Sequence, residues 1–201
     1  MYLLSGENIT CGYGAVDIVI NCNIGVYKGK ISSVVGPNGA GKSTAMKALF
    51  GLLPIKNGKV VFDGEDITNL PPQQRVLKGM GFVPQTNNIF PSLTVQENLE
   101  MGAFIDQNNI NEMLEYVYDL FPILKDKKNQ DAGELSGGQR QQVAVGRALM
   151  TKPKLLMLDE PSAGVSPIIM DGLFSKIKEI ANQGTAVLMV EQNAKQALKI
   201  S

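Results

Sequence analysis

The sequence predicts an α/β fold in which helices cover both faces of a mainly parallel sheet. Apolar segments alternate with helical patterns along the chain, and the runs 155–158 and 186–190 have no polar face, which is typical of strands buried on both sides. A glycine-rich segment, GPNGAGKST, stands between a predicted strand and a predicted helix. The helical stretch 86–150 interrupts the strand pattern, which indicates a lobe inserted into the α/β core.

The predicted elements follow one another in a regular order. Short β-rich runs open the sequence, with a turn expected at Gly29-Lys30 and another at Asp63-Gly64. The lysine-rich stretch KDKKNQDAGE is expected to be a solvated loop. The predicted strands are 3–9, 18–26, 31–35, 59–62, a strand that ends in GMGFVPQ, 155–158 and 186–190, and the predicted helices are 44–52, 94–119, 139–150 and 167–181.

The composition narrows the class of protein. A length of 201 residues suits one domain with a packed core, and Lys+Arg and Asp+Glu are equal at 19 each. The zero net charge gives no general attraction to nucleic acid, so no nucleic-acid partner is expected, and a bound anion needs a locally built site. No apolar run reaches the ~20 residues that cross a bilayer. Cys11 and Cys22 lack a CxxC spacing, which favours free thiols over the alternative of a disulfide.

A phosphate-binding loop, or Walker A motif, is predicted at the first strand–helix junction. The pattern G-x-x-x-x-G-K-[ST] lets successive N–H groups turn inward on phosphate oxygens, and the following helix adds its positive N-terminal end. Lys42 can reach the β- and γ-phosphates, and the Ser43 hydroxyl can ligate Mg²⁺. The alternative is a glycine-rich turn that only links strand to helix. The predicted nucleotide-binding residues here are Gly36, Pro37, Asn38, Gly39, Ala40, Gly41, Lys42, Ser43 and Thr44.

Two acids follow the apolar strand 155–158. Asp159 at the strand end is placed to hold Mg²⁺, often through water. Glu160, one residue further, is placed to orient or polarise a water for in-line attack on a γ-phosphorus. A solvated loop start is the alternative for such a pair, and the presence of the phosphate-binding loop favours the catalytic interpretation.

A second helix start has the chemistry of an anion site. Ser136, Gly137, Gly138 and Gln139 combine a small hydroxyl residue, two glycines and exposed N–H groups. One triphosphate is already assigned to residues 36–44, so this helix start faces either another ligand or a nucleotide held by another copy. The alternative is a plain helix N-cap at Ser136.

The motifs GPNGAGKST, VPQ, LSGGQ, LLMLDEPSAG and VLMVEQN, in this order, resemble the nucleotide-binding subunit of an ATP-binding cassette (ABC) ATPase over essentially the whole chain. The resemblance implies a P-loop NTPase core with an N-terminal β subdomain and an inserted helical lobe. It assigns 1–85 and 151–201 to the core and 86–150, with the LSGGQ signature, to the lobe. It implies a head-to-tail dimer with a second ABC ATPase subunit, identical or different, in which ATP and Mg²⁺ lie between one phosphate-binding loop and the partner's LSGGQ segment.

The resemblance also assigns single residues. Tyr13 is similar to the aromatic residue that stacks on adenine, the alternative being a half-buried strand tyrosine. Gln85 resembles the Q-loop glutamine, which contacts Mg²⁺ or the attacking water. Gln192 stands where many members carry a switch histidine that touches the γ-phosphate; an amide can donate to that phosphate but cannot titrate near neutral pH, and a polar start of the next helix is the alternative. Ser166 replaces an acid often found in the D-loop segment SAGVSP.

Within the family, DITNLPPQQRVLKGMGFVPQTNNIFPSLTVQENLEMGAF and VEQNAKQALKI look most like the ATP-binding subunit of branched-chain amino acid importers, the LivF-type. Gln85 and the run QRQQV differ from what those subunits often carry. The resemblance implies two transmembrane permease subunits, an indirectly coupled substrate-binding protein, and a place on the cytoplasmic face of the cell membrane. It also implies a few further strands beyond residue 201, so a shortened subunit is expected.

Two other functions stay open on the residues alone. A soluble cassette ATPase acting on DNA, ribosomes or cluster assembly would use the same motifs, although 86–134 is too short for a long coiled coil and the chain holds one cassette. A hydrolysis-poor regulatory subunit is the third possibility because the chain has no histidine, and Glu160 argues against it.

Overall fold

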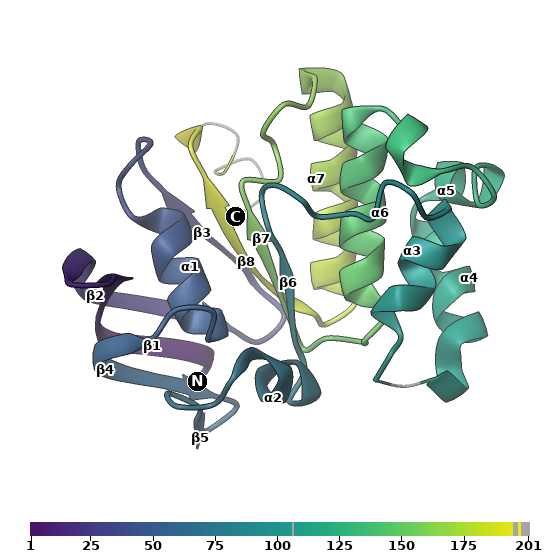
Figure 1. Ribbon diagram of the computed structural model, residues 1–201. Helices are drawn as coiled ribbons and strands as arrows, with labels where there is room; N and C mark the ends of the chain where they lie inside the picture. The colour runs from purple at the N-terminus through teal and green to yellow at the C-terminus, as the bar shows by residue number, and fades with distance from the viewer. Residues whose placement is uncertain (106, 195–196, 198–201) are drawn as a thin grey trace.

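The computed structural model describes residues 1–105, 107–194 and 197, and it contains two sheets with helices around one of them (Figure 1). The strands are β1 (Tyr2–Tyr13), β2 (Val16–Tyr27), β3 (Ile31–Val35), β4 (Ile55–Phe62), β5 (Glu65–Asp66), β6 (Met80–Val83), β7 (Leu155–Asp159) and β8 (Ala186–Glu191). The helices are α1 (Lys42–Phe50), α2 (Pro72–Leu77), α3 (Val95–Gly102), α4 (Ile110–Leu120), α5 (Pro122–Asp126), α6 (Gly137–Leu149) and α7 (Pro167–Asn182), with short 3-10 turns at Gln107–Asn109 and Ala132–Glu134.

The central sheet is parallel, with the strand order β3-β8-β7-β6. Its strands are apolar on both faces because each face packs against a different layer. Leu156 and Leu158 of β7 belong to the apolar cluster on the side of α6 and α7, whereas Leu155 and Met157 belong to the cluster that contains α1 and the other sheet. This is the physical reason for the continuous apolar runs in the sequence.

The second sheet is antiparallel, with the order β2-β1-β4-β5, and it covers α1 on the side away from the parallel sheet (Figure 1). Its first two strands are longer than the sequence pattern predicted. β1 continues to Tyr13 and turns at Gly14, where φ is +56°, directly into β2. Polar residues within both strands conceal this length, because β2 lies at the edge of the sheet and much of it is exposed.

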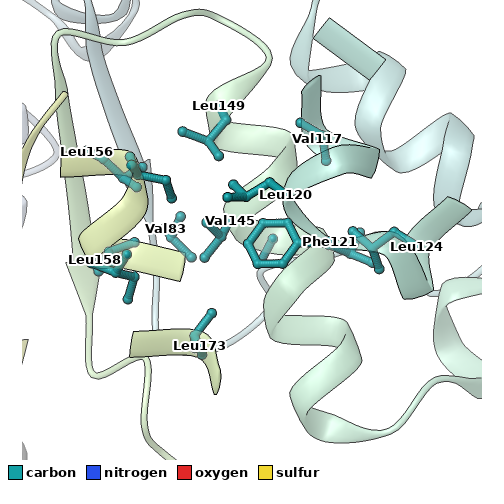
Figure 2. Close-up of a cluster of buried hydrophobic side chains, with 14 of the residues drawn as sticks. Val83, Val117, Leu120, Phe121, Leu124, Val145, Leu149, Leu156, Leu158 and Leu173 are labelled. Carbon is teal, nitrogen blue, oxygen red and sulfur yellow. The ribbon is translucent and has the colours of Figure 1, made fainter. Parts of the chain in front are cut away.

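Helices α3 to α6 form a lobe beside the parallel sheet (Figure 1). Val145 and Leu149 of α6 pack between β7 and the helices α4 and α5 (Figure 2). Phe121, which joins α4 to α5, belongs to the same apolar cluster. The single helix predicted over 94–119 is interrupted: α3 ends at Gly102, and α4 begins at Ile110. The short helix α2 was not predicted; its one positional signal is Pro72 at the first helical turn.

The predicted fold class is therefore confirmed. An α/β core with a parallel sheet, an N-terminal β subdomain and a helical lobe are all present, and the carboxyl ends of β3, β7 and β8 meet at one edge of the sheet, next to the start of α1. Cys11 and Cys22 are free thiols, as the sequence favoured.

Candidate functional site

The phosphate-binding loop forms one wall of a cavity of about 420 Å³. The loop leads from β3 into α1, and Gly41 at the helix start has φ +84°, in the left-handed region that favours glycine. A Cβ at Gly41 would also lie 3.2 Å from Cγ2 of Ile18, so β2 packs closely against the loop. The cavity is lined by Ile18, Asn38, Gly39, Ala40, Gly41, Lys42, Ser43, Thr44, Gln85 and Glu160.

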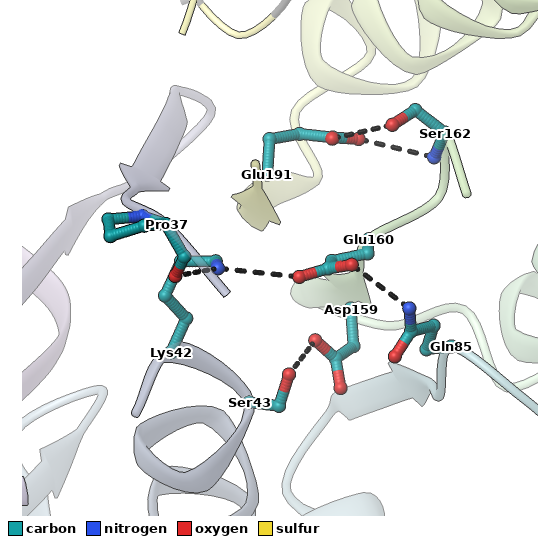
Figure 3. A network of polar contacts seen from close by, with 8 residues as sticks. All are labelled: Pro37, Lys42, Ser43, Gln85, Asp159, Glu160, Ser162 and Glu191. Carbon is teal, nitrogen blue, oxygen red and sulfur yellow. Dashed lines mark hydrogen bonds and ion pairs between the residues drawn. The ribbon is translucent and has the colours of Figure 1, made fainter. Parts of the chain in front are cut away.

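Lys42 is held between the loop and the acid at the end of β7. Its Nζ donates to the carbonyl oxygen of Pro37 at 3.0 Å and lies 3.4 Å from Oε1 of Glu160 (Figure 3). The other Glu160 carboxylate oxygen accepts from Nε2 of Gln85 at 2.9 Å. The Lys42 side chain is 5% exposed and that of Glu160 is 13% exposed, so this ion pair is shielded from water more than a surface pair would be.

Ser43 and Asp159 meet beneath this ion pair. The Ser43 hydroxyl donates to Oδ1 of Asp159 at 2.7 Å. Burial raises the pKa of the Asp159 carboxyl above its ordinary value, the hydrogen bond from Ser43 lowers it, and the charge of Glu160 raises it further. Residues predicted from two motifs that are 116 positions apart are thus brought within hydrogen-bond distance.

The parallel sheet explains why these groups converge. Val35, directly before the phosphate-binding loop, is opposite Glu191 of β8, and Asp159 is opposite Val190. In a parallel sheet the carboxyl ends of the strands meet at one edge, where open α/β sheets bind their ligands. Asp159 and Glu160 therefore face the start of α1 because β7 and β3 both lie beside β8.

The signature segment lies apart from this cavity. Among the described residues, none of 136–139 is found in the cavity lining. Ser136 is the N-cap of α6: its hydroxyl accepts from the Gln139 amide, and the Gln139 side chain accepts from the Ser136 amide. Gly138 packs against α7, because a Cβ there would lie 2.3 Å from Cγ2 of Ile169. Within one chain, Ser136 therefore acts as a helix N-cap, which was the alternative to an anion site.

Two other predicted site residues lie at exposed positions. Tyr13 ends β1 with 48% of its surface exposed, and it is not part of the cavity lining. Gln192 follows the end of β8 and is exposed. The helix expected after it falls largely on residues 195, 196 and 198–201, which lie outside the described residues.

Sequence reasoning missed three contributors to this region. Ile18 lines the cavity from an edge strand, where an apolar residue carries no motif. Glu191 accepts hydrogen bonds from Ser162, across 29 positions of sequence. Asn88 donates to Oε1 of the buried Gln141 at 2.9 Å and so ties the segment after Gln85 to α6. Of these three residues, Glu191 is the one that lies in a sequence motif, VEQN.

A second hollow, of about 350 Å³, lies between the lobe and the core on the side of β6. Val76, Met101 and Phe104 contribute to its mostly apolar lining, and Phe104 is 66% exposed. Arg147 also lines this hollow, and its guanidinium carbon lies 4.9 Å from the centre of the Phe90 ring. Burial lowers the pKa of Arg147, although the group remains cationic at neutral pH.

The loop between β3 and α1, together with Lys42, Ser43 and the acids after β7, defines the class: a P-loop protein that binds a nucleoside triphosphate. The sequence then gives the family. A family model described as "ABC transporter" matches residues 19–163, and the chain belongs to this family. It is an ATP-hydrolysing, nucleotide-binding subunit of the ABC type.

Individual relatives agree with this assignment. The chain is 42% identical over 200 residues to the high-affinity branched-chain amino acid transport ATP-binding protein BraG of Pseudomonas aeruginosa, covering 99% of this chain and 86% of the relative. It is 39% identical to a probable branched-chain amino acid transport ATP-binding protein LivF of Archaeoglobus fulgidus, covering 99% and 85%. A crystal structure of a nucleotide-free ATP-binding cassette from an ABC transporter superposes with a TM-score of 0.88 at 33% identity, covering 100% and 85%.

None of the described helices combines the length and apolar character of a membrane-spanning helix.

Proposed function

We propose that this protein is the ATP-hydrolysing subunit of an importer for branched-chain amino acids. The observation that carries the hydrolytic part is the convergence of Lys42, Gln85 and Glu160 on one cavity at the end of the parallel sheet. The similarity to BraG and LivF, both described as branched-chain amino acid transport ATP-binding proteins, carries the transport part.

The residues divide the hydrolytic work by their chemistry. The loop N–H groups and Lys42 hold the β- and γ-phosphates, so positive charge faces the oxygens on which negative charge develops. Glu160 accepts a proton from a water molecule while the water oxygen attacks the γ-phosphorus. The bond between the γ-phosphorus and the β–γ bridging oxygen breaks, and ADP leaves. Gln85, which donates to Glu160, orients this carboxylate or the water. Gln192 contacts the γ-phosphate as a neutral amide.

The residues present fit a magnesium ion accompanying ATP. Ser43 and Asp159 supply a hydroxyl and a carboxylate at one point, and Gln85 supplies an amide oxygen. Magnesium usually takes one or two protein oxygens and completes its shell with phosphate oxygens and water. When bound, the ion neutralises charge on the phosphates.

A second ATPase subunit completes the site in this proposal. The start of α6, where Ser136 and Gly137 are exposed, is separate from the cavity of its own chain. A head-to-tail pair would place this helix start, with its positive dipole end, on the γ-phosphate held by the partner. Tyr13, at the end of β1, would then stack on the adenine outside the part of the cavity that holds phosphate.

The groove between lobe and core is the proposed docking site for a permease. It exposes Met101 and Phe104 beside the Arg147 cation, a combination that suits a short amphipathic segment with an acidic residue. The subunit would work at the cytoplasmic face of the membrane with two permease subunits, and a substrate-binding protein would act on it through them. Relatives at 36% and 33% identity are lipopolysaccharide export ATP-binding proteins LptB of Haemophilus influenzae and Escherichia coli, so lipid export is the outcome to test against.

The test combines turnover with transport. We expect the protein, assembled with its permease, to hydrolyse ATP in a Mg²⁺-dependent manner, and we expect Glu160→Gln to retain ATP binding and lose most turnover, at least 10²-fold by the usual size of general-base effects. Glu134→Gln, an exposed carboxylate in the lobe, is the matched control. Uptake of labelled leucine, isoleucine or valine into vesicles separates amino acid import from lipid export. Full turnover by Glu160→Gln would refute the assignment of Glu160.

A further inference from the structure

The carboxylate at the end of β8 is a buried group to which the hydrolytic scheme above gives no role. Glu191 is fully buried. Its Oε1 accepts from the Ser162 backbone amide at 3.2 Å and its Oε2 accepts from the Ser162 hydroxyl at 2.6 Å (Figure 3). The backbone amide of Gln192 also donates to this carboxylate. One side chain thus holds two segments that lead to different parts of the site.

The first of these segments carries the proposed base. Glu160 has φ +48°, a left-handed conformation that is strained for a non-glycine residue and persists only where its surroundings hold it. Its amide donates to the carbonyl of Val190 at 3.0 Å, and its own carbonyl accepts from Ala163 at 3.0 Å. Ser162 lies within this turn, so its two bonds to Glu191 fasten the turn to β8 at a second point beside the bond to Val190.

The second segment carries Gln192. Because Glu191 is the last residue of β8, its carboxylate holds the amide of the next residue as the chain leaves the sheet. The turn after Glu160 also reaches the signature helix: a Cβ at Gly137 would lie 3.5 Å from the carbonyl oxygen of Gly164. The turn therefore lies between the strand end with Gln192 and the start of α6.

A purely structural explanation accounts poorly for a carboxylate here. Among the described residues no ion pair involves Glu191, and its negative charge lies near that of Glu160, which disfavours it. Burying a charge in this way is costly, and a glutamine of the same shape would avoid the cost. What the carboxylate offers is two acceptor oxygens at once, for the amide and the hydroxyl of one residue, and this fixes Ser162 in both position and orientation.

We propose that Glu191 is a positioning residue of the ATPase: by holding Ser162 and the Gln192 amide together, it makes the left-handed turn at Glu160 and the Gln192 segment one rigid unit. This rests on the proposed function, since it concerns the hydrolysis assigned to Glu160. The phosphate-contacting residue cannot then shift without shifting the base, so contact with the γ-phosphate and placement of Glu160 occur together.

The test uses Glu191→Gln and Ser162→Ala in the full chain assembled with its partners. We expect kcat to fall about 10- to 100-fold in each, the effect of misplacing a catalytic group by about an ångström, with KM for ATP changed less than about threefold. Both variants weaken the same link, Ser162→Ala by removing the hydroxyl bond while the backbone amide bond remains, so the double variant should lose little more than Glu191→Gln alone. Ser162→Thr keeps the amide and the hydroxyl and should retain most activity. Glu179→Gln, an exposed carboxylate on α7 paired with Lys176, is the matched control.

A second measurement is independent of turnover. Hydrogen exchange of the nucleotide-free subunit should show faster exchange of the amides of residues 160–165 in Glu191→Gln and Ser162→Ala, and unchanged exchange in β3 and β6. If Glu191→Gln proves unfolded by thermal denaturation, Ser162→Ala, which removes the hydroxyl bond to Glu191 from the less buried partner, decides the question.

Full kcat with unchanged exchange in both variants would overturn the positioning role. Equal loss of kcat and rise in KM without faster exchange of 160–165 would also overturn it, since that pattern indicates a general loss of binding. Failure of the proposed function looks different: wild-type protein would then lack ATP turnover, while the exchange measurement would still report on the link through Glu191.

Discussion

Gln192 and Glu191 show how two adjacent residues at a strand end can differ completely in environment. Glu191 is fully buried against Ser162, whereas Gln192 is exposed as the chain leaves the sheet. An exposed polar side chain at this edge can reach a bound phosphate, while the buried one can act only on neighbouring protein groups. The two roles proposed for them follow from this difference in exposure.

The proposed phosphate contact of Gln192 gives a pH prediction. The chain contains no histidine, so wild-type hydrolysis should show no titration of an imidazole. Gln192→His should introduce a group that titrates near pH 6.5 into the pH profile of kcat, because the charged and neutral imidazoles bind phosphate differently. Gln73→His, at an exposed position of α2, is the control and should leave the profile as in wild type. Full ATPase activity and unchanged ATP-driven pairing in Gln192→Ala would exclude the contact.

Arg75 is the second residue whose burial leads to a prediction. Its side chain is 1% exposed and donates to the carbonyls of Leu49 at 2.7 Å, Leu70 at 2.8 Å and Thr68 at 2.9 Å. It thereby satisfies the carbonyls at the end of α1 and the loop before α2, and burial lowers its pKa to about 10. Arg75→Met should lower the free energy of unfolding by roughly 3 kcal/mol or more, since it leaves several buried acceptors unpaired.

Urea unfolding of Arg75→Met measures this loss. Arg140→Met is the comparison, because Arg140 donates to Leu135 at 2.9 Å and only weakly to Gly133, at 3.4 Å. A loss at Arg75 no greater than that at Arg140 would contradict the structural role assigned to the buried guanidinium.

At the level of secondary structure, two glycines in helices predict opposite effects of the same substitution. Gly102 ends α3 where it crosses α6, and a Cβ there would lie 2.1 Å from the backbone oxygen of Arg147. Backbone cannot move aside cheaply, so Gly102→Ala should destabilise the protein by roughly 1–3 kcal/mol or more. Gly172 is exposed within α7 and a Cβ there meets nothing within 4 Å, so Gly172→Ala should stabilise the protein by roughly 0.4–1 kcal/mol.

Thermal and urea unfolding of the two alanine variants settle the sign of each effect. Gly102 lies in the helical lobe, outside the cavity that holds the phosphate-binding loop. ATP binding by the isolated subunit therefore checks that the core remains intact in Gly102→Ala. Stabilisation by alanine at both positions would show that α3 and α6 are further apart than described.

The elements that could be predicted from sequence are those whose signal is local. β3, β7 and β8 are short, apolar and followed by motif residues, and the loop before α1 carries its own pattern. The break between α3 and α4 and the short helix α2 were missed, because tertiary packing decides them. In the site, Lys42, Ser43, Asp159 and Glu160 came from motifs, whereas the bond between Ser162 and Glu191 joins residues 29 apart through strand order alone.

For the whole molecule, the two sheets are also joined by ion pairs. Asp63, in the turn after β4, accepts from Lys154 at 2.8 Å, just before β7, and lies 2.8 Å from Nζ of Lys28 at the end of β2. The hydrogen bonds from these lysines lower the pKa of Asp63 from 3.8 to about 2. One exposed carboxylate thus links the antiparallel sheet to the parallel one.

This link predicts how stability changes in acid. The folded state holds the Asp63 proton less tightly than the unfolded chain, so the contribution is complete above pH 4 and is lost as the pH falls from about 4 to about 2. The difference in unfolding free energy between wild type and Asp63→Asn should therefore be largest near neutral pH and shrink over that interval. It should also shrink with added salt, because the three side chains are partly exposed. Urea unfolding at several pH values measures it, with Asp126→Asn, an exposed carboxylate at the end of α5, as control. A difference that stays constant from pH 7 to pH 2 would show that Asp63 acts through the geometry of its turn, where φ is +49°, and not through its charge.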